Sequence, residues 1–130
     1  MTPAEICLRV AAGQSVEMTD VLTWLRRAGC GGRVCTESLG LTRTALVKAR
    51  DSALLEAACL LGADQCSVWE LAGRLEAAIL RFESRIWPRL RSGANADLGP
   101  VDAALHRVFV SGTGVNRHRR KLYAWLLLTR

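Results

Sequence analysis

Residues 67–87, SVWELAGRLEAAILRFESRIW, form the stretch that decides the fold. Their apolar side chains recur every three or four residues, which is the spacing of one face of an α-helix, and most of their charged side chains fall off that face. The apolar positions are Val68, Leu71, Ala72, Leu75, Ala78, Ile79, Phe82 and Ile86. Ser67 and Glu70 are spaced as a capping box, and Pro88 is expected to end or kink the helix near Trp87. We expect the apolar face to lie in the core, with a dimer interface as the alternative.

Helical patterns also cover most of the remaining sequence. The expected helices run from Pro3 to about Ala12, from Thr19 or Asp20 to Arg27, from Arg43 to Leu61, from Pro100 to about Phe109, and from Asn116 to Leu128. Asp51-Ser52 leaves open whether 43–61 is one helix or two, and 108–110 is the only strand-like fragment. The sequence therefore predicts an all-α fold, a single compact domain of five to seven helices around a long amphipathic helix at about 67–87.

The length of 130 residues fits one domain with its own core. Within residues 1–130 we expect two subregions, 1–62 and 66–130, with a linker of small residues at about 92–99. No apolar run approaches the roughly 18 residues of a membrane span, so we expect no membrane contact. The first residues lack a basic segment followed by an apolar run, and we therefore expect no secretory signal and a cytoplasmic location.

The best functional clue lies at residues 33–50, whose layout resembles a helix-turn-helix. Gly40 stands where the chain must reverse between two helices, and Thr42 is a natural N-cap for the second one. In DNA-binding proteins of this kind the second helix enters the major groove. The side chains that we expect to contact DNA from it are Arg43, Thr44, Lys48 and Arg50.

The alternative for this segment is a plain helical corner. Leu39-Gly40-Leu41-Thr42 is also how one helix ends and another begins, and Thr36 stands where such motifs prefer a smaller residue. Gly31 and Gly32 leave room for only about two helical turns before Gly40.

A second basic segment follows a glycine turn near the C-terminus. Its cations lie beside His118 and are Arg117, Arg119, Arg120 and Lys121. Like charges this dense repel one another unless an anion is near, and a helix N-terminus attracts a phosphate. We expect this segment to hold the DNA backbone. The alternative is a solvated basic turn that Leu122, Trp125 and Leu126 dock on the core.

The charge distribution favours a polyanionic partner, whereas the chemistry of an enzyme is missing. The formal net charge is +6, and its surplus lies in residues 1–50 and 91–130. The five cysteines are irregularly spaced, and Cys30 and Cys35 have no second pair with which to bind zinc. Asp102 and His106 are four residues apart and indicate a surface hydrogen bond more than a catalytic dyad. We expect no enzymatic activity, no cofactor and no metal.

These observations predict a small DNA-binding protein with a regulatory or accessory role, for example in transcription regulation. The competing hypothesis is a helical adaptor that binds another protein without binding nucleic acid, through apolar side chains such as Trp24, Trp87 or Trp125. A homodimer is compatible with either function. The sequence fixes neither the DNA target nor the protein partner.

Overall fold

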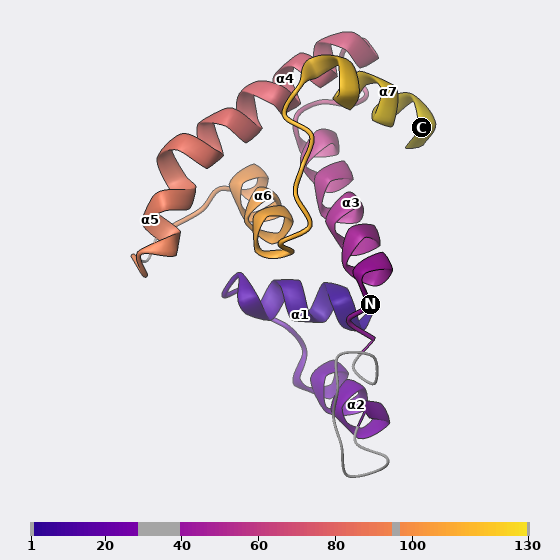
Figure 1. Ribbon diagram of the computed structural model, residues 1–130, viewed down its shortest axis with the longest axis vertical. Coiled ribbons are helices and arrows are strands. Elements are labelled where there is room, and N and C mark those ends of the chain that lie inside the picture. Colours follow the sequence, from indigo (N-terminus) through magenta and orange to yellow (C-terminus); the bar gives the residue numbers. More distant parts are fainter. Residues whose placement is uncertain (1, 29–39, 95–96, 130) are drawn as a thin grey trace.

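Every element that the structure describes is helical (Figure 1). The computed structural model describes residues 2–28, 40–94 and 97–129. Its elements are α1 (Pro3–Ala11), α2 (Met18–Ala28), α3 (Arg43–Leu60), α4 (Val68–Arg81), the π-helical segment η1 (Phe82–Ile86), α5 (Trp87–Arg91), α6 (Pro100–Val110) and α7 (Arg119–Thr129). These residues contain no β-strand, so the all-α prediction is confirmed, and 108–110 belongs to a helix.

The helices pack around α6 and the long rod formed by α4, η1 and α5 (Figure 1). Helix α6 lies between this rod and α3, α1 packs across both α3 and α6, and α7 lies along α4. Helix α2 extends beyond α1 at one end of the molecule (Figure 1). Because the main core joins residues from α3, α4, α6 and α7, the chain before residue 62 and the chain after it share one interior.

The apolar face of residues 67–87 lies in that core, as we expected, and not at a dimer interface. Leu75, Ile79 and Phe82 are fully buried, whereas Val68 and Ile86 pack at its edge. Ser67 caps α4 by accepting the Glu70 N–H through its hydroxyl at 3.2 Å. Burial of side chains of this size stabilises the fold by roughly 1.5–3 kcal/mol each.

Of the two outcomes expected at Pro88, an end or a kink of the helix near residue 87, the end does not occur. The helix continues through α5 to Arg91 after the π-helical turn of η1. In that turn the Trp87 N–H donates to the carbonyl of Phe82, five residues earlier. Pro88 has no N–H and its ring crowds the carbonyl four residues before it, so a locally widened turn accommodates the proline and lets the helix continue.

Residues 43–60 form one helix, which settles the question left open by Asp51-Ser52. The side of α3 that faces the core carries the small residues Ala49, Ala53, Ala57 and Ala58, all buried. Small side chains let α6 approach closely along the length of α3. Asp51 does not cap a new helix, because its carboxylate accepts from the neighbouring Arg50 instead.

Two predicted helix starts are wrong. Helix α2 begins at Met18, so Thr19 and Asp20 stand inside its first turn. Helix α7 begins at Arg119, three residues beyond the predicted cap at Asn116. The described helices include none with the length and apolarity needed to cross a lipid bilayer.

Candidate nucleic-acid interface

The first two turns of α3 form an exposed basic surface. Arg43, Thr44 and Lys48 are all exposed, whereas Ala49 on the other side of the helix is buried. The first turn holds no acidic residue. No described residue forms an ion pair or a side-chain hydrogen bond with Arg43 or Lys48. The positive end of the helix dipole adds to these charges, so this end of α3 attracts anions.

The glycine turn and the helix cap predicted at the start of α3 are both present. Gly40 has a φ of 71°, the left-handed region that glycine adopts without strain. Thr42 caps α3 by accepting the Ala45 N–H through its hydroxyl at 3.2 Å. The first helix predicted for the motif, at about residues 33–39, lies outside the described residues.

Helix α1 holds the start of α3 in place. Ala4 and Leu8 of α1 form a small buried cluster with Ala49 of α3, and Leu41 and Leu46 pack against it. Pro3 lies close to Gly40, since a Cβ built there would be 3.4 Å from the Pro3 ring. The exposed turns of α3 therefore rest on a packed support.

Arg50, the fourth predicted contact on α3, is used inside the protein. Its guanidinium pairs with Asp51 at 2.8 Å and donates to the carbonyl of Gly114 at 3.0 Å. Only 20% of its side chain is exposed. Arg50 thus fastens α3 to the loop between α6 and α7.

In the C-terminal basic segment, Arg117 pairs with a carboxylate of the rod. Its Nε and Nη2 atoms donate to the two oxygens of Glu83 at 2.6 and 2.8 Å. The hydrogen bond with Arg117 lowers the pKa of the Glu83 carboxyl, and the same bond raises the pKa of Arg117. This bidentate pair takes up the charge that the sequence alone assigned to a phosphate.

Arg119 clamps α7 onto α4. Its guanidinium lies 4.4 Å from the centre of the Trp69 ring, and its Nε and Nη2 atoms donate to the Trp69 carbonyl at 3.1 and 3.0 Å. The Arg119 backbone N–H donates to Glu76 at 2.6 Å. The carboxylate of Glu76 therefore occupies the anion position at the N-terminus of α7.

Arg120 and Lys121 are the exposed cations of this segment, and no described residue pairs with either of them. They stand in the first turn of α7, which lies beside α4 at the opposite end of α3 from Arg43 (Figure 1). Helix α3 alone, with 18 residues, is about 27 Å long. The eight predicted residues therefore fall into three groups. Three are exposed at the start of α3, two are exposed in the first turn of α7, and the remaining three are arginines that bind acceptors within the protein, Arg50, Arg117 and Arg119.

The sequence did not reveal the partners of these arginines. Glu76 and Glu83 are far from residues 117–119 along the chain, and their spacing indicated only a charged helix face. Two further arginines, Arg85 and Arg89, are exposed and have no ion-pair partner among the described residues. In the sequence nothing distinguishes these two side chains from ordinary solvated charges.

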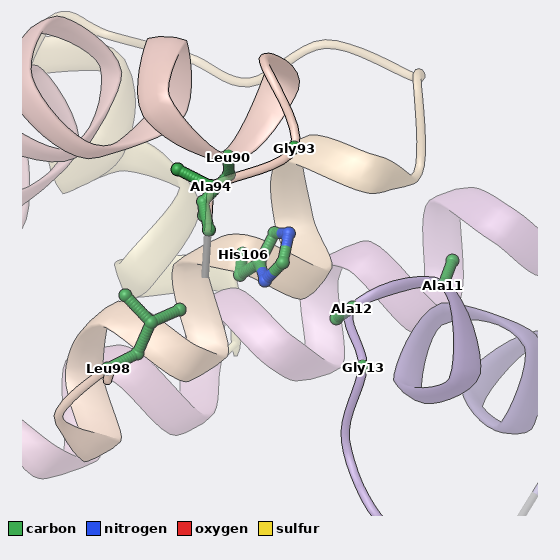
Figure 2. A pocket seen from close by; sticks show the side chains of 8 residues that line it. All are labelled: Ala11, Ala12, Gly13, Leu90, Gly93, Ala94, Leu98 and His106. Carbon is green, nitrogen blue, oxygen red and sulfur yellow. The ribbon is translucent and has the colours of Figure 1, made fainter. Parts of the chain in front are cut away.

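A hollow of about 340 Å³ lies between α1, α6 and the end of α5, and His106 faces it (Figure 2). Its walls are small or apolar residues such as Gly13, Gly93 and Leu98. The expected hydrogen bond between His106 and Asp102 is absent, because Asp102 accepts from Arg81 at 3.1 Å. Burial lowers the pKa of the imidazole.

Comparison with protein-family models, with curated proteins and with solved structures finds no match. Within the described part of the chain, no group of three or more His, Cys, Asp and Glu side chains is placed to hold a metal ion. Cys30 and Cys35 lie outside that part. The geometry of the exposed charges is thus the basis for a functional proposal.

Proposed function

We propose that the protein binds duplex DNA through the first two turns of α3, as a small regulatory or accessory protein. The observation that carries this proposal is the exposure of Arg43, Thr44 and Lys48 together at a capped helix N-terminus, with no internal partner in the described chain. Arg50, Arg117 and Arg119 have such partners, and we leave them out of the binding surface.

The three side chains have complementary roles at a duplex. Thr44 and Lys48 are four residues apart and share a face of α3, while Arg43 occupies the first helical position. Recognition helices contact base edges through their N-terminal residues, where arginine and lysine pair with guanine or with phosphates. Threonine contacts either a phosphate or the methyl group of thymine.

Arg120 and Lys121 supply a second, weaker contact in this proposal. Both side chains are exposed, but they stand in a turn whose helix N-terminus Glu76 already neutralises. They are suited to nonspecific attraction of a phosphate backbone, which falls off within a Debye length.

A salt titration with matched variants tests the proposal. Binding of a fluorescent mixed-sequence duplex would be followed by anisotropy from about 25 to 200 mM salt, because each neutralised phosphate contributes about 0.9 to the slope of log affinity against log salt. The double variant Arg43→Gln/Lys48→Gln should lower that slope by about 2 and weaken binding roughly tenfold.

The control is Arg85→Gln/Arg89→Gln, which removes the same charge from exposed side chains of η1 and α5. It should leave most of the affinity intact. Equal losses in the two double variants would show that net charge alone attracts the duplex, and the α3 proposal would then fail.

The adaptor function remains the second candidate because α2 presents an apolar face. Met18, Leu22 and Leu25 follow the spacing of one helical face, and they are 68%, 45% and 48% exposed. By contrast, Trp87 and Trp125, two of the aromatics first considered for an interface, pack against the main core. No binding of duplex DNA at low salt, together with capture of a partner that Leu22→Glu abolishes, would establish the adaptor instead.

A further inference from the structure

A small cavity of about 80 Å³ lies where α1, α3 and α6 meet, and two arginines from different helices line it. Arg9 comes from the last turn of α1 and Arg107 from the last turn of α6. Ser52 of α3 lines the same cavity. A single water molecule needs only about 10–15 Å³ of cavity volume, so the space holds several waters or one small ion.

Arg107 is a buried cation with one carboxylate partner and one buried donor that has no partner in the described chain. It is only 8% exposed, although arginine is rarely buried without full pairing. Of the five donors of its guanidinium, Nη2 donates to Glu56, and the buried Nε–H has no acceptor in the described chain. A buried charged donor without a partner is costly, so an acceptor is expected beside it.

Arg9, which also lines the cavity, has the same deficiency. Its Nε–H is also buried without an acceptor among the described residues, and no described carboxylate pairs with it. The two glutamates that line the cavity are already engaged. The Glu5 carboxylate accepts from the Thr2 N–H at 3.1 Å, and Glu56 accepts from Arg107.

We propose that this cavity binds a small oxyanion, the carboxylate or phosphate group of a small molecule, between Arg9 and Arg107. Guanidinium groups match such groups by donating two parallel hydrogen bonds to their oxygens. The side chain of Glu56 is 48% exposed, so it balances the charge of Arg107 only in part. The Ser52 hydroxyl adds a neutral donor. A bound oxyanion would link α1 to α6 beside the buried face of α3.

Arginine side-chain NMR tests this site directly on the whole protein. The Nε–H resonances would be followed while acetate or inorganic phosphate replaces chloride at constant ionic strength. We expect the resonances of Arg9 and Arg107 to shift saturably, and those of Arg85 and Arg89 to stay in place. Saturation by acetate alone assigns a carboxylate, and saturation by phosphate alone assigns a phosphate group, and either result supports the site.

A variant pair gives an independent readout. The oxyanion that saturates the site should raise the Tm by several degrees relative to chloride, because it binds the folded state. Arg9→Met, which keeps the apolar stem, should weaken binding at least tenfold and remove that rise. Arg89→Met should leave both unchanged. Absence of saturable shifts with either ion, or an equal Tm rise in Arg9→Met, would overturn the proposal and leave a water-filled cavity.

Discussion

At the scale of single residues, the arginines named above differ in whether their guanidinium groups bind acceptors within the described part of the chain. Arg50, Arg117 and Arg119 all reach acceptors from other parts of the chain, whereas Arg43 and Arg120 do not reach any in the described residues. The planar guanidinium supports this use, because it stacks on an aromatic ring and donates to a carbonyl at once. Charge in the sequence is therefore a poor guide to charge available for binding.

Replacing Arg119 tests the clamp. Arg119→Ala removes the contact with the Trp69 ring and two hydrogen bonds to the Trp69 carbonyl, and it should lower the free energy of unfolding by about 1–2 kcal/mol. The adjacent Arg120→Ala should change it by less than about 0.5 kcal/mol. Urea denaturation of the two variants measures the difference, and equal effects would contradict the assignment of Arg119 as a clamp.

His106 makes stability depend on pH. Burial depresses the pKa of its imidazole below the usual 6.5, so the unfolded chain takes up a proton at a higher pH than the folded protein does. The stability from neutral His106 is therefore complete above about pH 6.5 and declines as the pH falls towards the depressed pKa. The Tm measured from pH 7.5 to 5 should decline, and it should decline less in His106→Gln. Parallel curves for the two proteins would rule out this origin.

At the scale of elements, the starts of helices show what the sequence predicts and where it fails. Thr42 and Ser67 were both predicted as caps, and each accepts a hydrogen bond from the backbone three residues later. These bonds are local, so the sequence contains both partners. Helix α7 is capped by Glu76 of α4, 43 residues away, and no local pattern announces such a partner.

For a related reason, the sequence could not predict that the helix widens into a π-helical turn at Phe82–Ile86. The sequence locates Pro88 as a source of strain, but whether the helix stops or widens depends on how much burial lies beyond it. Here Trp87 and Leu90 pack against the main core, and Trp87 lies 5.5 Å from the Phe109 ring between centroids. Continued packing favours the widened helix over an end at residue 87.

Removal of the remote cap tests the account of α7. Glu76→Ala leaves the first N–H of α7 without its acceptor, and we expect a loss of about 1 kcal/mol in the free energy of unfolding. Asp64→Ala removes an exposed carboxylate from the turn before α4 and serves as the control. Denaturation curves that do not separate the two variants would show that the cap contributes little.

At the scale of the whole molecule, the exposed basic side chains lie at separate places. The start of α3 and the start of α7 stand at different levels along the long axis (Figure 1). The sequence predicted each basic segment but not their separation, since that depends on the packing of α3 with α6 and of α4 with α7. The proposed duplex site therefore centres on α3, and α7 is proposed only as an accessory contact.

The proposal that α3 is the DNA-binding helix is tested most directly by mapping the DNA contact with NMR. Amide resonances of the isotope-labelled protein would be recorded while a short mixed-sequence duplex is added at low salt. We predict that the largest shifts fall on residues 42–48 at the start of α3, with smaller shifts at Arg120 and Lys121. Shifts confined to the start of α7 or to α5, or no shifts at all, would contradict the assignment of α3 as the DNA-binding helix.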